Sequence, residues 1–163
     1  MKKNTGKILF ILFTVFMSLT VFSCNRKEGY AAMLWGIPEH HLQDGDIVTV
    51  YSKSNIIHKY IIGTPDGEKI EIPLWQITDP GSKRKARKQY KKISEYNHKY
   101  ASVKLDGLPC RNGPQNLAKQ VYRLRKGEVI KVLSTGQGDP VMKGKEELPG
   151  EWLRILTKDG TQG

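Results

Sequence analysis

The sequence predicts a mainly β protein with one basic helix, placed after an N-terminal export segment. Three observations carry this prediction. Residues 8–22 form an uninterrupted apolar run, short β-branched runs follow turn residues at several points, and residues 82–100 show helical spacing. The part after the export segment is long enough for one medium domain or two small ones. The repeated strand patterns favour two.

The export segment begins with Lys2, Lys3 and Lys7, which precede the apolar run at 8–22. A charged stretch followed by an apolar stretch is the layout of a secretory signal. The run is shorter than the roughly 20 residues that cross a bilayer, so a cleaved signal fits better than a permanent membrane helix. A short uncleaved anchor is the alternative.

The end of the run, Val21-Phe22-Ser23-Cys24, resembles the lipobox of bacterial lipoproteins. In that family the cysteine thiol receives a diacylglycerol and becomes the mature N-terminus. Phe22 departs from the pattern, because the family usually has a small residue there. The resemblance implies that 1–24 is a signal peptide with lipobox, and a plain signal with a coincidental cysteine is the alternative. Residues 25–43 are then interpreted as a polar tether and lead-in.

The charge of the exported part is strongly basic. Without the three lysines of the signal, 24 Lys and Arg remain against 16 Asp and Glu, a net charge of +8. Such a surface is attracted to anionic partners. Because export removes the protein from nucleic acids, we expect the partners to be phospholipid head groups or acidic wall polymers. The expected location is the cell envelope, on a membrane face that the sequence does not specify.

Two stretches of the chain repeat the same order of elements. Residues 44–52 and 126–134 each read as a turn, an acidic residue and then a strand, and 60–67 and 153–160 each read as a strand ending in an Asp-Gly turn. This predicts a duplicated β-hairpin unit, with a longer loop at 135–151 in the second copy.

Residues 68–75 predict a further strand in the first copy, with Ile70, Ile72 and Leu74 on one face. The second copy has no counterpart, because the sequence given ends just after its turn at Gly163. A barrel without its closing strand exposes an edge that pairs with a partner or frays. We therefore expect either a truncated chain or a partner strand at this edge.

Between the copies, residues 82–100 predict a basic amphipathic helix. Ala86, Tyr90, Ile93, Asn97 and Tyr100 recur at helical spacing, and Tyr90, Ile93 and Tyr100 are expected to pack inward. Seven of the ten residues 83–92 are basic, which suits the start of a helix poorly. They are Lys83, Arg84, Lys85, Arg87, Lys88, Lys91 and Lys92. The helix is either a solvated linker or a face that contacts anionic lipid.

Residues 103–163 resemble the bacterial SH3 (Src homology 3, SH3b-like) domain family. The matching motifs, in family order, are Leu108-Pro109-Cys110-Arg111-Asn112-Gly113-Pro114, residues 121–133, Gly150-Glu151-Trp152 and Asp159-Gly160. The departures are Pro109, Cys110, the loop at 135–151 and the missing final strand. The resemblance implies a small SH3-like barrel. Residues 44–78 resemble a degenerate second copy, and the whole is similar to tandem SH3-like lipoproteins of spirochaete-type envelopes.

The candidate ligand groove of the second unit consists of Arg111, Tyr122 and Trp152. Arg111 and Tyr122 lie near turns where a groove could form, and aromatic-lined grooves recognise extended peptides. Trp152 is as well suited to filling a small core. The expected function is therefore non-catalytic recognition of cell-wall peptide, peptidoglycan or an envelope partner. The alternative is a structural lipoprotein with no small ligand.

Catalytic and metal chemistry is not expected. Cys110 and the four histidines could form a cysteine–histidine pair, but Cys110 lies in a predicted strand with no activating base nearby in sequence. His40 and His41 are adjacent and would point to opposite faces of a strand. No phosphate-binding glycine motif or zinc-ligand spacing is present, so we expect no cofactor and no metal.

Overall fold

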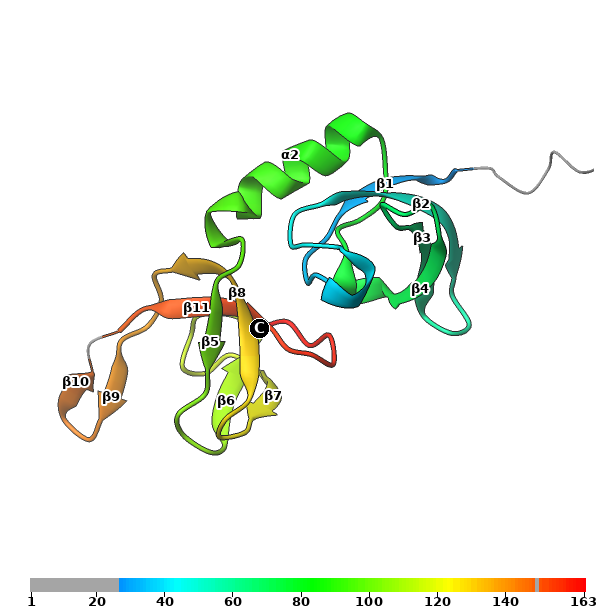
Figure 1. Ribbon diagram of the computed structural model, residues 1–163. Helices are drawn as coiled ribbons and strands as arrows, with labels where there is room; N and C mark the ends of the chain where they lie inside the picture. Colours follow the sequence, from blue (N-terminus) through cyan, green and yellow to red (C-terminus); the bar gives the residue numbers. More distant parts are fainter. Residues whose placement is uncertain (1–26, 149) are drawn as a thin grey trace, which may run out of the picture.

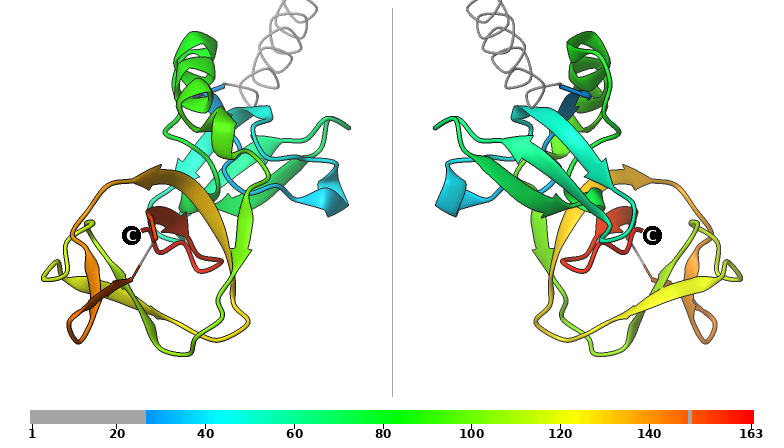
Figure 2. Two further views of the ribbon diagram at one scale, coloured as in Figure 1. Left: turned by 90° about the vertical axis from the view of Figure 1, so that its left-hand side faces the viewer. Right: turned by 90° about the vertical axis from the view of Figure 1, so that its right-hand side faces the viewer.

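The computed structural model describes residues 27–148 and 150–163 (Figure 1). The predicted signal segment, the lipobox and Cys24 lie outside the described residues. No helix in the described part is both long and apolar enough to span a bilayer. The fold is mainly β, as predicted, with two small barrels and the helix α2 (Figures 1 and 2).

The first barrel is a four-stranded antiparallel sheet closed on itself. Its strands, in both chain and spatial order, are β1 (Gly29–Ala32), β2 (Ile47–Ser54), β3 (Lys59–Gly63) and β4 (Lys69–Pro73). After β4 a 3-10 turn, η3 (Leu74–Gln76), returns the chain to β1, where Ile77 and Gly81 bridge Met33 and Tyr30. The segment after η3 thus pairs with the outer edge of β1.

The core of this barrel comes from alternate positions of the strands. Val48 and Val50 of β2, Ile62 of β3 and Ile72 of β4 are all at most 4% exposed, because successive strand residues point to opposite faces. Met33 and Leu42, from the loop between β1 and β2, fill the same interior. A second 3-10 turn in that loop is η2 (Pro38–His40).

The first barrel begins earlier than the sequence predicts. The interpretation of 25–43 as a tether and lead-in is wrong for residues 29–43, because β1 pairs with β2 from Gly29 opposite Val50 to Ala32 opposite Ile47. The unit thus runs from Gly29 to Gly81 rather than over 44–78. Its first strand has no β-branched residue, so it lacks the composition by which strands are recognised.

The predicted helix forms, but it is shorter than expected. α2 spans Lys83–Ile93, and its N-cap Ser82 accepts a hydrogen bond from the Lys85 N–H at 3.2 Å. A 3-10 turn, η4 (Ser94–Tyr96), follows, and its C-cap Asn97, at ψ 131°, ends the helical path. Tyr100 therefore begins a strand and is 40% exposed, although Tyr90 and Ile93 do face the barrels.

The second barrel is built from β5 (Tyr100–Ser102), β8 (Val129–Gly136) and β11 (Trp152–Leu156), in the order β11-β8-β5. Two hairpins form separate two-stranded sheets beside it. They are β6 (Leu108–Arg111) with β7 (Gln120–Leu124), and β9 (Val141–Lys143) with β10 (Glu146–Leu148). The second hairpin occupies the long loop predicted at 135–151. The core consists of Val103, Cys110, Leu124, Ile130 and Ile155.

The two barrels are copies of one structural unit, and their strands pair in the same register. Ala32 pairs with Ile47 as Ser102 pairs with Val129. Both central strands also carry a bulge at the same position, since Val50 opposite Ile62 corresponds to Val132 opposite Ile155. The structure therefore contains the repeat predicted from the strand patterns.

The turns of the two copies share their hydrogen bonds as well. Asp46 accepts from the Gln43 N–H as Glu128 accepts from the Arg125 N–H. Gly45 and Gly127, at φ 89° and 82°, occupy the same left-handed position, where a side chain would be strained. In the second copy, Gly163 pairs with Ile155 by two backbone hydrogen bonds, as Ile70 pairs with Ile62 in the first.

Core burial predicts a large difference between two isoleucines of the first barrel. Ile62→Ala should lower the free energy of unfolding by about 2–5 kcal/mol, because Ile62 is fully buried and its truncation leaves a cavity. Ile56→Ala is the matched control, since Ile56 is 92% exposed, and should change stability by less than about 0.5 kcal/mol. Urea denaturation measures both. Equal effects of the two substitutions would contradict the placement of β3.

Candidate ligand-binding surface at the junction of the barrels

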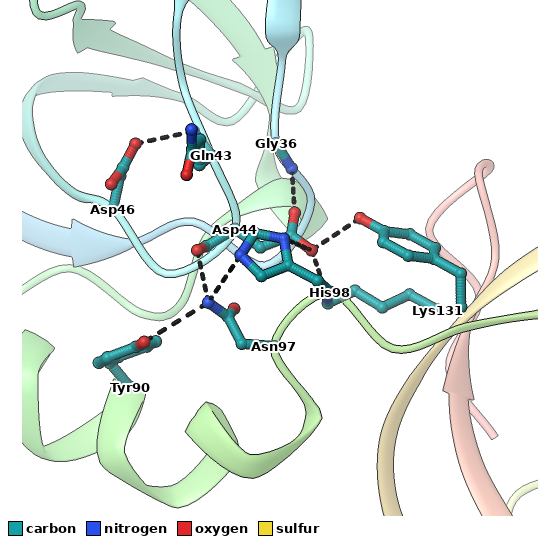
Figure 3. Close-up of polar contacts among 9 residues, drawn as sticks. Gly36, Gln43, Asp44, Asp46, Tyr90, Asn97, His98 and Lys131 are labelled. Carbon is teal, nitrogen blue, oxygen red and sulfur yellow. Dashed lines mark hydrogen bonds and ion pairs between the residues drawn. The ribbon is translucent and has the colours of Figure 1, made fainter.

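The two barrels are joined through a buried carboxylate, Asp44. Its side chain is 3% exposed and lies at the end of the loop between β1 and β2 of the first barrel. One oxygen, Oδ1, accepts a hydrogen bond from the Gly36 N–H at 2.6 Å within the same loop. The other, Oδ2, accepts from the Tyr100 hydroxyl at 2.8 Å and from Lys131 Nζ at 2.5 Å, both in the second barrel (Figure 3).

Lys131 is the cation of this pair and is as buried as Asp44, with 3% of its side chain exposed. Its amine also lies 4.7 Å from the centre of the Tyr100 ring. A buried ion pair recovers its desolvation cost only when the geometry is good and further hydrogen bonds satisfy the charges. Here Gly36 and Tyr100 supply those hydrogen bonds.

The same contacts set the titration of this group. Burial alone would raise the pKa of Asp44, but the hydrogen bonds from Lys131, Tyr100 and Gly36 outweigh burial, so its pKa is lowered. The pKa of Tyr100 is raised, by burial first and then by the hydrogen bond to Asp44. At neutral pH the carboxylate is therefore charged and the phenol is protonated.

The segment after α2 also contacts Asp44, through Asn97 and His98. Asn97 Nδ2 donates to the backbone carbonyl of Asp44 at 2.8 Å and to the Tyr90 hydroxyl at 3.4 Å (Figure 3). His98 Nδ1 lies 3.7 Å from Asp44 Oδ2, with 60% of its side chain exposed. Gly45 packs against Tyr90 so closely that an added Cβ would lie 2.3 Å from the ring. These contacts fix α2 and the first barrel relative to each other.

An aromatic cluster lies beside the ion pair. The Trp35 ring is edge-on to Trp75 at 6.1 Å and to Tyr100 at 5.2 Å, measured between ring centres. Trp35 comes from the β1–β2 loop, Trp75 from η3 and Tyr100 from the second barrel. Leu34, Leu133 and Leu156 are buried against Trp35 and Trp75, and Gly160 lies directly against Trp75. The three rings are only partly buried.

A loop of the first barrel places two exposed apolar side chains near η3. Ile56 and Ile57, between β2 and β3, are 92% and 53% exposed. The carbonyl of His58, the next residue, accepts from the Leu74 N–H at 3.2 Å, which ties this loop to the turn that carries Trp75. We call Trp35, Trp75, Tyr100, Ile56 and Ile57 the junction surface. It offers aromatic edges and aliphatic groups, which suit an extended apolar segment of a ligand.

The predicted groove residues of the second barrel each have an internal partner. Arg111 Nη1 donates to the Ala118 carbonyl at 2.8 Å, and Trp152 Nε1 donates to the Asp139 carbonyl at 2.8 Å. Tyr122 packs against the core of the second barrel. In the described part of the chain, no hydrogen bond or ring contact joins the three. A groove at these residues stays a prediction.

The junction surface was not predicted from the sequence. Trp35 falls in the stretch interpreted as a tether, and Trp75 at the end of a predicted strand. One signal was available: two of the three tryptophans of the chain lie in the unit with the weaker family resemblance. A large aromatic residue outside a predicted strand core indicates a contact that the local pattern does not explain.

The seven predicted lipid-contact residues of α2 are all exposed. They are Lys83, Arg84, Lys85, Arg87, Lys88, Lys91 and Lys92. Lys85 Nζ donates to the Pro80 carbonyl at 3.2 Å, and Lys83 Nζ lies 5.7 Å from the centre of the Tyr30 ring.

Cys110 is a free thiol, 5% exposed in β6. Burial, and then the charge of Glu128, raises its pKa, which disfavours the reactive thiolate. Within residues 27–148 and 150–163, no three His, Cys, Asp or Glu side chains form a group that could hold a metal ion. His40 lies in η2 and His41 follows it at φ 54°, so neither is in a strand.

Loss of the buried cation predicts a large loss of stability. Lys131→Met should lower the free energy of unfolding by about 3–5 kcal/mol, because Asp44 would stay buried without its partner. Adding Asp44→Asn should recover part of this loss. Lys126→Met, at an exposed position of the same barrel, is the control and should have little effect. Similar losses in urea denaturation for Lys131→Met and Lys126→Met would refute the buried pair.

The lowered pKa of Asp44 predicts acid sensitivity. A carboxyl with a depressed folded-state pKa stabilises the protein above its unfolded value, near 3.9, and this contribution is lost as the pH falls toward the folded value. The stability difference between the natural chain and Asp44→Asn should therefore shrink as the pH falls below about 4. Urea denaturation at a series of pH values measures it. A difference that is constant with pH would argue against a charged Asp44.

Comparison with known proteins agrees with this fold. Residues 28–95, which hold the first barrel and α2, match the N-terminal SH3 domain of the TP0260 family. Over 145 residues, 89% of this chain, the sequence is 41% identical to an uncharacterized protein of Treponema pallidum (strain Nichols). The chain spans about a third of that relative's length, 32%. No solved structure matches the chain. The matched unit is the barrel predicted above as degenerate, so the chain carries an SH3-like domain at residues 28–95.

Proposed function

We propose that the protein is a non-catalytic interaction module of the cell envelope, and that its paired barrels bind an extended peptide of the cell wall or of an envelope partner at the junction surface. The observation that carries the proposal is the meeting of three partly exposed aromatic rings from two barrels. Trp35 stands edge to face with Trp75 and with Tyr100, and the loop with Ile56 and Ile57 is hydrogen-bonded to the turn that carries Trp75.

The rigidity of the junction favours binding. The Asp44–Lys131 pair and the buried leucines beneath the rings hold Trp35 and Tyr100 in one arrangement. A surface that is already ordered loses little entropy when a ligand binds. Extended peptides are recognised by aromatic-lined surfaces with pockets for alternate side chains. The junction surface offers the aromatic rings for such recognition.

The proposed attachment to a membrane rests on the sequence. The charged and apolar start of the chain, followed by Cys24, fits a lipoprotein signal whose thiol carries a lipid. Attachment would keep the barrels near the wall polymer or the envelope protein that they bind. The buried Cys110, with its raised pKa, supports a non-catalytic role.

A structural role is the second candidate, and one observation favours it. Leu34 of the first barrel, with Leu133 and Leu156 of the second, forms a cluster that buries surface between the barrels. In that case the barrels bind each other and carry no small ligand. The predicted groove at Arg111, Tyr122 and Trp152 is the other place where a ligand could bind.

Binding to wall material tests the proposal. The detergent-solubilised full chain is mixed with purified peptidoglycan sacculi at low and high salt, and bound protein is measured after sedimentation. Ile56→Ser with Ile57→Ser should weaken binding about tenfold or more, because apolar burial is lost. Both side chains are exposed, so the fold should be unaffected.

The matched control is Val141→Ser with Met142→Ser, two similarly exposed apolar residues on β9 of the second barrel. Equal binding by the junction variant and the control would reject the junction surface. Loss of binding after Arg111→Ala would instead place the site in the second barrel. Binding that disappears at high salt in all forms indicates a charge-driven association.

A further inference from the structure

α2 concentrates positive charge that the protein itself does not neutralise. Its eleven residues contain seven Lys and Arg and no Asp or Glu. Arg84 and Lys88, and likewise Lys88 and Lys92, are four residues apart, a spacing at which like charges destabilise a helix. Basic residues in the first turn also oppose the helix dipole. An anionic partner would relieve both costs.

The outward face of α2 is fixed by the packing of its inner face. Ala86 is fully buried against the first barrel, and Tyr90 lies on Gly45. Ile93 packs beside the leucine cluster between the barrels. The helix therefore cannot turn about its axis, and the side opposite these residues is always presented to the surroundings.

Five basic side chains occupy that opposite side. We call them the α2 basic face, and they are Arg84, Arg87, Lys88, Lys91 and Lys92. In the described part of the chain their side chains make no hydrogen bond, ion pair or ring contact. The nearest acidic residues in sequence, Asp79 and Glu95, lie beyond the two ends of the helix and form no ion pair there.

The start of the helix lies beside the point where the chain enters the first barrel. The Tyr30 N–H donates to the Gly81 carbonyl at 2.8 Å, and the Gly81 N–H donates back at 3.0 Å. Gly29 approaches Gly81 so closely that a Cβ would lie 2.7 Å from its carbonyl oxygen. Cys24 is four residues before Glu28, which spans at most about 14 Å. Figures 1 and 2 show α2 at one end of the molecule.

We propose that the α2 basic face rests on anionic phospholipid head groups and so sets the orientation of both barrels at the membrane. The inference goes beyond ligand binding and shares only the membrane attachment with the proposed function. The apolar side of α2 is used by the barrel, so the contact is electrostatic and the helix does not insert. Each cation near an anionic surface strengthens the contact about fivefold, and salt weakens it.

Chemical protection on vesicles tests this proposal in the full chain. The chain is reconstituted with vesicles of phosphatidylcholine alone or of phosphatidylcholine mixed with phosphatidylglycerol. Exposed arginines are then modified with a membrane-impermeant dicarbonyl reagent and located by mass spectrometry. Arg84 and Arg87 report on the α2 basic face, and the exposed Arg123 and Arg125 of the second barrel serve as internal references.

We expect Arg84 and Arg87 to react several-fold more slowly on the anionic vesicles, and high salt to remove this protection. The reference residues Arg123 and Arg125 should react equally fast on both kinds of vesicle. The variant Lys88→Glu, Lys91→Glu, Lys92→Glu should lose the protection. A control with the same change of charge, Lys104→Glu, Lys119→Glu, Lys126→Glu on the second barrel, should keep it.

Equal labelling of Arg84 and Arg87 on neutral and anionic vesicles would overturn the proposal. Equal loss of protection in the two triple variants would also overturn the proposal, because protection would then depend on net charge alone. Protection by soluble polyglutamate but not by anionic vesicles would replace the lipid with an acidic polymer. Flotation of the protein with the vesicles reports membrane attachment separately. Flotation without protection of Arg84 and Arg87 rejects only the contact of the α2 basic face with lipid. No flotation with either vesicle composition rejects both that contact and the proposed attachment.

Discussion

The arrangement of the whole molecule depends on one buried ion pair. Asp44 and Lys131 come from different barrels, and neither could stay buried without the other at tolerable cost. The repeat does not generate a second ion pair of this kind, because the equivalent positions hold other residues. Asp44 corresponds to Lys126 in the second copy, and Lys131 corresponds to Thr49 in the first. The two copies share a backbone, and differences at these positions allow one to dock on the other.

Both proposed contact surfaces follow from this docking. Tyr100 joins the Trp35–Trp75 pair only because docking brings it from the second barrel to Trp35, next to the ion pair. Asn97 and Tyr90 extend the same junction to α2, which fixes the direction of its basic face. A ligand on the junction surface and a membrane on the α2 basic face would therefore be held in a fixed orientation relative to each other.

The second barrel has a β6–β7 hairpin and a long loop that the first barrel lacks, and both contribute to its own stability. The β6–β7 hairpin supplies Cys110 and Leu124 to the core, and the long loop supplies the carbonyl that accepts from Trp152. The motifs by which residues 103–163 resemble bacterial SH3 domains therefore mark residues that stabilise this barrel. The first barrel, which matches the family model, carries Trp35 and Trp75, which have no role in a strand core.

The sequence by itself determined the strands at 47–52, 60–63 and 129–134, the turns at Gly45 and Gly127, and the basic helix. Each depends on local alternation, turn chemistry or helical spacing, and these are written in neighbouring residues. The tertiary structure decided the rest. β1 is a strand because its partner β2 supplies the pairing, not because of its own composition. Asp44 looks like an ordinary turn residue, and only the approach of Lys131, 87 positions away, makes it a buried anion. Long-range contacts of this kind leave no periodic trace in one sequence.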